Sequence, residues 1–249
     1  MPVAWIALAP GLRKEGGAGR FHIFAMKTAA TQATALPLPR ARLWAEFVVL
    51  FAGVPVAMAV FFGQYPLFPV ILSLAVLALV LLALTPDFSP RELLRGPVAG
   101  QWKLIAAFAL AGAALCFGLT LALVPERLLE LPRHRTGLWL LILLVYPLLS
   151  AAPQELIYRV LFFRRYGALF PGDKLALAAN SAAFGLAHLF YMSPLTIGLT
   201  ALAGLIFGAV YLRFGSVLLS TVLHGLAGQL VFTSGLGIYF YHGAVAQMP

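Results

Sequence analysis

The chain has 249 residues, of which 62% are hydrophobic and only 10% charged, and its mean hydropathy is +0.95. The 17 basic and 8 acidic side chains are too few to coat a soluble domain of this size, so lipid must solvate much of the surface. The net charge of +9 lies in short clusters between apolar runs, which is typical of membrane helices rather than of nucleic-acid binding. The composition therefore predicts an integral membrane protein whose partner is the bilayer, with no nucleic acid.

Successive apolar runs predict an all-α fold, a polytopic transmembrane helical bundle of about seven spans. The fourth run is long and contains Pro153, so we expect a kink there, and a re-entrant or split arrangement would change the count to six or eight. The predicted spans are residues 43–62, 67–84, 103–124, 137–163, 175–191, 195–212 and 216–234. In the sixth span Gly204 and Gly208 form a GxxxG pattern, which favours close packing against another helix.

The basic residues distinguish the two ends of these spans. Thirteen of the 17 lie on the side of the N-terminus, three lie on the opposite side, and Arg159 falls inside a span. This asymmetry predicts a cytoplasmic N-terminus and an outer C-terminus. The thirteen are Arg13, Lys14, Arg20, Lys27, Arg40, Arg42, Arg91, Arg95, Lys103, Arg164, Arg165, Lys174 and Arg213.

Four regions follow from this layout. Residues 1–42 form a cytoplasmic tail, 43–136 the N-terminal transmembrane helices, 137–235 the membrane core with the candidate site, and 236–249 an outer tail. The first 25 residues lack the apolar region and cleavage site of a signal peptide, and Met26 is an alternative start.

A small set of polar residues lies at lipid depth, where ionisable groups are costly and mark functional sites. Gln154, Glu155 and Arg159 fall in the fourth predicted span, His188 in the fifth and His224 in the seventh. At about 1.5 Å per helical residue, Glu155 lies roughly 13 Å and His224 roughly 12 Å from the inner surface. His188 lies roughly 21 Å from that surface, or less if its helix starts later. One carboxylate and two imidazoles can therefore share one layer.

These residue types form a coherent hydrolytic set. Two neutral imidazoles suit a divalent transition metal such as zinc, and a neighbouring carboxylate can take a proton from metal-bound water. Arg159 lies one turn after Glu155 and can form an ion pair with it, while Asn180 is a further hydrogen-bond partner. Two other interpretations stay open: a purely structural ion pair with backbone-bonded histidines, or the proton relay of a small transporter.

Three short segments in this order resemble the CPBP family (CAAX prenyl-protease and bacteriocin-processing, or Abi) of intramembrane metalloproteases. They are residues 153–159 (PQELIYR), 184–188 (FGLAH) and 224–228 (HGLAG). The resemblance covers about residues 137–235. It implies a metal-dependent endopeptidase of the bacterial inner membrane that cleaves membrane-anchored or hydrophobic peptides and protein C-termini for maturation or sorting.

By the same resemblance, His188 and His224 bind or orient the attacking water and a divalent metal, for which zinc is the expectation. Glu155 is the expected base, with Gln154 as its polar neighbour and Arg159 as the residue that holds it.

The chain departs from the family pattern at two positions. Gln154 stands where the family usually has the glutamate that serves as base, and an amide cannot take a proton at neutral pH. Gly228 stands where the family commonly has asparagine, and the adjacent Gln229 could substitute for it. The alternative to an enzyme is therefore a catalytically silent family member that binds hydrophobic peptides or regulates partners.

Overall fold

The computed structural model describes residues 38–61 and 67–240, and all regular structure in these ranges is helical. Five helical runs are long and apolar enough to cross a membrane: Arg40–Phe61, Trp102–Leu123, Thr136–Leu169, Pro194–Phe214 and Val217–Ser234. The prediction of an all-α polytopic membrane bundle is confirmed, while seven spans and a cytoplasmic N-terminus stay predictions. Residues 1–37, with the alternative start at Met26, and residues 241–249 of the predicted outer tail lie outside the described ranges.

The α-helices follow the predicted spans closely, with one short addition, α5. In chain order they are α1 (Arg40–Val48), α2 (Val54–Phe61), α3 (Leu67–Ala83), α4 (Trp102–Leu123), α5 (Glu130–His134), α6 (Thr136–Tyr146), α7 (Ala152–Glu155), α8 (Asp173–Leu186), α9 (Pro194–Phe214) and α10 (Val217–Ser234). Three π-helical stretches continue these helices. The first, Val49–Gly53, joins α1 to α2; the second, Pro147–Ala151, joins α6 to α7; and the third, Leu156–Tyr166, extends α7.

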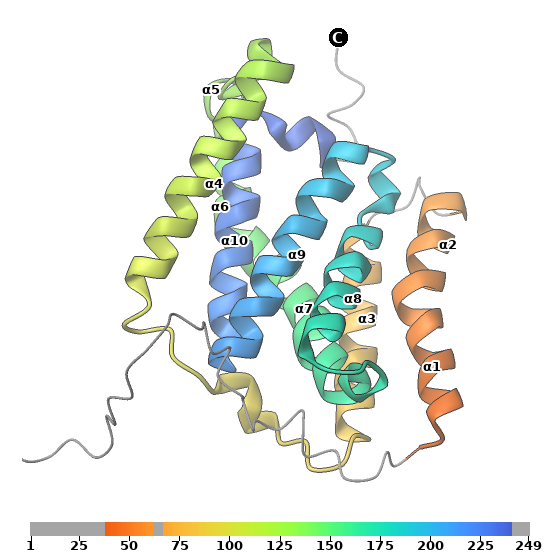
Figure 1. Cartoon of the computed structure of the whole chain (residues 1–249). Helices are drawn as coiled ribbons and strands as arrows, with labels where there is room; N and C mark the ends of the chain where they lie inside the picture. The colour runs from red at the N-terminus through yellow and green to blue at the C-terminus, as the bar shows by residue number, and fades with distance from the viewer. Residues whose placement is uncertain (1–37, 62–66, 241–249) are drawn as a thin grey trace, which may run out of the picture.

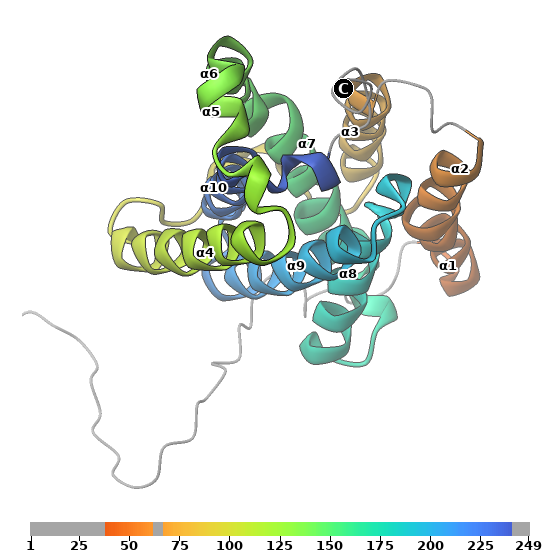
Figure 2. The same cartoon turned by 90° about the horizontal axis from the view of Figure 1, so that it is seen from above.

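The long helices run alternately up and down (Figure 1). The start of α1 and the turn between α9 and α10 lie at one end, and α5 lies at the other. Seen along the bundle, α7 and α10 occupy the middle, with α3, α4, α6, α8 and α9 around them (Figure 2). Two of the three predicted site helices, α7 and α10, thus lie inside the bundle, where their polar side chains are shielded from lipid.

The fourth predicted span is one continuous helical run, Thr136–Leu169, so the split alternative is not realised. Both of its internal prolines lie at or beside a π-helical turn: Pro147 begins the first, and Pro153 lies three residues before the second. A proline lacks the N–H that an α-helix would use, and a wider π turn changes which backbone groups must pair. This irregular stretch carries Gln154 and Glu155.

The GxxxG pattern packs α9 closely against α8, as predicted. A methyl group at Gly204 would lie 2.9 Å from the Cβ atom of Phe184. One at Gly208 would lie 2.6 Å from Leu177 and 2.9 Å from Asn180. The two glycines therefore let α8 approach until Phe184 and Asn180 reach the interior of the bundle.

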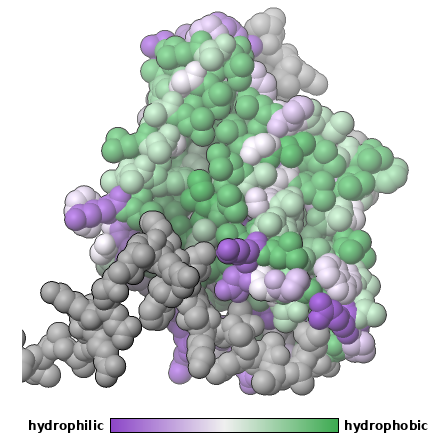
Figure 3. All heavy atoms as spheres, viewed as in Figure 1, coloured by the Kyte–Doolittle hydropathy of each residue, from purple (hydrophilic) through white to green (hydrophobic). Residues whose placement is uncertain are grey.

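The outer surface is apolar in the manner of a protein solvated by lipid. Large side chains such as Leu110, Leu144 and Leu148 are mostly exposed, at 73%, 72% and 67% of their surface. Figure 3 shows hydrophobic residues over most of the visible middle of the molecule, with hydrophilic residues gathered toward its ends. An exposed apolar band of this extent in water would be an aggregation site, so it fits a membrane environment.

A polar cluster of Arg165, Glu46 and Thr85 connects the end of the fourth span to α1 and to the end of α3. Arg165, with a side chain only 3% exposed, pairs with Glu46 at 2.8 Å. It also donates to the hydroxyl of Thr85 at 3.1 Å. This cluster fixes one wall of the bundle around the candidate site.

Candidate active site

The site is built on a buried ion pair between Glu155, the last residue of α7, and Arg159, one turn later. The Arg159 Nε atom lies 2.9 Å from Glu155 Oε2, and both side chains are 0% exposed. A second contact joins Arg159 Nη2 to Glu155 Oε1 at 3.5 Å. The ion pair predicted from the i,i+4 spacing is present.

Helix α8 completes the environment of Arg159. Its Nη1 group donates to the Oδ1 atom of Asn180, whose own amide donates to the carbonyl oxygen of Tyr158. The guanidinium also lies 4.9 Å from the centre of the Phe184 ring. Charge, hydrogen bonds and an aromatic face thus compensate the cost of burying the arginine. Asn180 supports Arg159 and through it Glu155.

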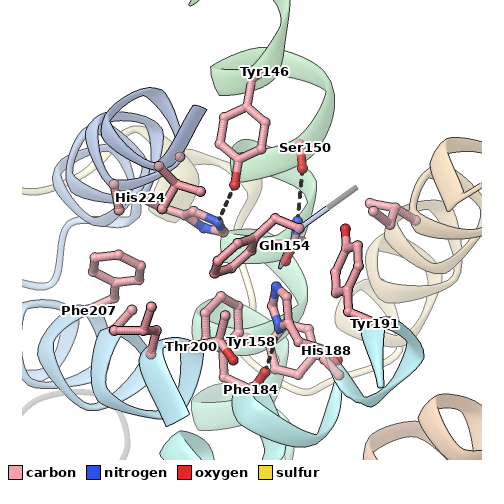
Figure 4. A pocket seen from close by; sticks show the side chains of 18 of the residues that line it. Tyr146, Ser150, Gln154, Tyr158, Phe184, His188, Tyr191, Thr200, Phe207 and His224 are labelled. Atoms are coloured by element: carbon pink, nitrogen blue, oxygen red, sulfur yellow. Dashed lines mark hydrogen bonds between the residues drawn. The ribbon is translucent and has the colours of Figure 1, made fainter. Parts of the chain in front are cut away.

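His224 of α10 connects the ion pair to the interior of the bundle. Its Nδ1 atom lies 2.9 Å from Glu155 Oε1, and its Nε2 atom lies 3.2 Å from the hydroxyl of Tyr146. Because a carboxylate oxygen accepts, Nδ1 is assigned as the donor, and the Nε2 atom of a neutral ring then accepts from the phenol. Glu155, His224 and Tyr146 therefore form one hydrogen-bonded chain, whose last link Figure 4 shows.

Two glycines on α10 make room for this chain. A methyl group at Gly228 would overlap the ring of Tyr146, and one at Gly225 would lie 3.3 Å from Pro147. The amide of Gln229, the predicted substitute for the family's asparagine, donates instead to the backbone carbonyl of Leu143 at 2.8 Å. The polar group that meets His224 Nε2 therefore comes from Tyr146 rather than from α10.

His188 lies just beyond the end of α8. Its Nδ1 atom lies 2.8 Å from the carbonyl oxygen of Phe184, which can only accept, so Nε2 carries the lone pair. The Phe184 ring touches both imidazoles, with centroid distances of 5.0 Å to His188 and 5.4 Å to His224. The two histidines thus flank one aromatic ring, as Figure 4 shows.

Both imidazoles line a cavity of about 360 Å³. Its walls are mainly apolar side chains of α2, α3, α4 and α9. The polar residues of the lining are Tyr146, Ser150, Gln154, Tyr158, His188, Tyr191, Thr200 and His224. Glu155 and Arg159 are fully buried behind this lining, whereas Gln154 belongs to it and donates to Ser150 at 3.0 Å.

The donor set does not complete the predicted zinc site. Among the described residues no group of three or more His, Cys, Asp or Glu side chains could hold a metal ion. Catalytic zinc normally takes three protein ligands, whereas here two imidazoles share the cavity. The one nearby carboxylate, Glu155, already has its oxygens engaged by Arg159 and His224.

The fold and these contacts define a helical integral membrane protein with a polar site enclosed beside an apolar cavity. Residues 136–228 match the family model described as type II CAAX prenyl endopeptidase Rce1-like. The matched segment contains all five predicted site residues and Tyr146, and the match confirms the family resemblance predicted from the sequence. Comparison with curated proteins and with solved structures gives no match. The match likens this segment, somewhat more than a third of the chain, to a family of endopeptidases.

Proposed function

We propose that this protein is an intramembrane endopeptidase that hydrolyses membrane-anchored or hydrophobic peptides inside the cavity. The observation that carries the proposal is the 2.9 Å contact between Glu155 and His224 at the cavity wall, within the segment that matches an endopeptidase family. A bacterial inner membrane is the location that we propose with it.

The contacts favour a role for Glu155 that differs from the one predicted from sequence. A carboxylate that accepts the Nδ1–H bond of an imidazole orients the ring and stabilises the positive charge formed when Nε2 takes a proton. Glu155 is 0% exposed and its oxygens are engaged, so it acts through His224 rather than directly on water. His224 then serves as the general base of the reaction.

The opposite side of the cavity supplies the other groups that hydrolysis needs. The His188 Nε2 lone pair can accept a hydrogen bond from the attacking water, because Nδ1 is held by the Phe184 carbonyl. The amide of Gln154 gives one N–H to Ser150 and has a second for the oxygen of the scissile carbonyl. In this scheme Gln154 is an electrophilic group, a role that does not require a carboxylate.

The cavity also defines the substrate class. Most of its lining is apolar and comes from helices that are themselves exposed to lipid. A hydrophobic peptide segment or a lipid-linked protein C-terminus would therefore bury its apolar part there and bring a backbone carbonyl to the histidines. Prenylated C-terminal peptides are the first probes to use, because the family description names them.

One observation favours a second candidate function. Gln154 occupies the cavity wall without a carboxylate beside it, and the only carboxylate of the site is enclosed behind that wall. A protein with this lining could bind hydrophobic peptides and release them uncut, as a regulator of partners.

Cleavage of a quenched-fluorescence peptide by the full chain in nanodiscs separates the two candidates. Peptides with and without a prenylated cysteine are compared, and the His224→Ala variant is expected to lower kcat about 1,000-fold. His134→Ala, in α5, is the matched control and should retain full activity. Tight peptide binding without cleavage by the wild type would reject the endopeptidase and support the second candidate.

A chelator added to the same assay tests the metal. The contacts predict that activity survives chelation, because the described part of the chain offers two imidazoles at the site and no third metal-ligating side chain. Loss of activity on chelation, with recovery on adding zinc, would restore the metal predicted from sequence and reject the metal-free scheme.

A further inference from the structure

Tyr146 is the one residue of the hydrogen-bonded chain to which the scheme above gives no role. Its hydroxyl lies 3.2 Å from His224 Nε2, the atom that must take the proton from water. The phenol also belongs to the cavity lining. A water molecule in the cavity therefore meets the phenolic oxygen where it would otherwise meet the imidazole nitrogen.

The position of this phenol is fixed by packing on three sides. The ring stands edge-on to Phe232 at 5.8 Å and to His224 at 6.0 Å. On the third side it occupies the space that any side chain at position 228 would need. Pro147, the next residue, packs against Gly225 of the same helix. The tyrosine and the two glycines of α10 are thus complementary in shape, which keeps the hydroxyl on His224.

We propose that Tyr146 is the proton relay between the Glu155–His224 pair and the attacking water. This inference rests on the proposed function, and it adds a catalytic residue to it. A carboxylate, an imidazole and a hydroxyl joined by successive hydrogen bonds form the arrangement by which an imidazole activates a hydroxyl group. Here the activated hydroxyl passes the proton on.

The step balances as follows. A water O–H bond breaks and its proton goes to the phenolic oxygen of Tyr146, while the phenolic proton moves to His224 Nε2. The water oxygen bonds to the carbonyl carbon, and the carbonyl π electrons move to the oxygen. On collapse the C–N bond breaks, and the proton returns from His224 through Tyr146 to the leaving nitrogen. The phenol and the imidazole end as they began.

Tyr146→Phe tests the relay because it removes only the hydroxyl. We expect kcat to fall about 100-fold while KM changes less than about twofold, the usual range for loss of a general acid–base group. Tyr211→Phe is the matched control, since that ring stacks on Phe163 away from the cavity and should leave kcat unchanged.

Two further measurements separate a relay from a packing role. The rate in mixtures of H2O and D2O should curve with the deuterium fraction in the wild type, because two protons move together, and should become linear in Tyr146→Phe. Gly228→Ala should lower kcat by displacing the phenol, and the Tyr146→Phe/Gly228→Ala double variant should lose no more than the worse single variant. Gly118→Ala, at an open position on α4, is the control.

A readout without substrate keeps the inference testable if no cleavage is found. In protein labelled with ¹⁵N at the histidine rings, the Nε2 resonance of His224 should move in Tyr146→Phe and stay in Tyr211→Phe. Unchanged resonances, or full activity with a curved isotope plot in Tyr146→Phe, would overturn the relay. A moved resonance in a protein that cuts no peptide would reject the endopeptidase and leave the hydrogen bond from Tyr146 established.

Discussion

Replacing Arg159 alone by methionine should destabilise the protein far more than replacing both Arg159 and Glu155 by neutral residues. Arg159 and Glu155 are both 0% exposed and pair at 2.9 Å. Methionine matches only the aliphatic part of the arginine side chain and carries no charge, so the single variant leaves the Glu155 carboxylate buried without its cation. Breaking a buried pair in this way costs about 3–5 kcal/mol of folding free energy.

The double variant Glu155→Gln/Arg159→Met removes both charges. An amide at position 155 can still accept from His224, so the hydrogen bond to the imidazole survives. We expect the double variant to lie within about 2 kcal/mol of the wild type, since exchanging a buried ion pair for neutral groups is often nearly neutral. The stability of the double variant should therefore exceed that of Arg159→Met.

Equilibrium unfolding in mixed detergent micelles measures both differences. Arg127→Met is the control, because Arg127 pairs with Glu130 at 2.6 Å with side chains 40% and 28% exposed. Such a surface pair should contribute at most about 1 kcal/mol. If Arg159→Met were as stable as Arg127→Met, or if the double variant were no better than Arg159→Met, the reasoning about the buried pair would be refuted.

Three further predictions concern packing around the site and can be measured by the same unfolding assay. Gly208→Ala should lower the free energy of unfolding by about 1–3 kcal/mol, because the added methyl group would overlap side chains of α8. Gly198→Ala, at an open position on α9, should raise it by about 0.5–1 kcal/mol, and equal effects of the two variants would refute the close contact. Gly96→Ala should lower the free energy of unfolding more than Gly100→Ala does. Both glycines have a positive φ (87° and 86°), but only at Gly96 would the added methyl group also overlap the loop before α10. Glu46→Gln should lower stability by removing the negative charge that lies 2.8 Å from the buried Arg165, and no loss would show that hydrogen bonds alone hold this arginine.

Local patterns in the sequence predicted the parts of the site that lie on one helix. The i,i+4 spacing of Glu155 and Arg159 predicts their ion pair, which is present. The GxxxG pattern predicts a close helix contact, which α8 makes. Both are fixed by helix geometry within a few residues, so no knowledge of the tertiary structure is needed.

The contact between Tyr146 and His224 could not be predicted in this way, because the two residues are 78 positions apart. Tyr146 lies within the apolar run of the fourth predicted span, where nothing in the sequence assigns it a partner. The one available signal was the small residue at position 228, which the sequence analysis interpreted as a missing asparagine. In the structure, the ring of Tyr146 occupies the space that a side chain at position 228 would need.

The sequence by itself determined the solvent and the fold class of this protein, since an apolar surface with few charges is stable in lipid and continuous apolar runs of this length cross the bilayer as helices. It also determined which polar residues lie deep enough to need partners. Only the tertiary structure decided the partners that come from other helices: Glu155 also meets His224 and lies behind the cavity wall, whereas Gln154 lines the cavity. The physical reason is that hydropathy and helical periodicity act along the chain, whereas the orientation of a buried side chain depends on groups brought beside it by packing.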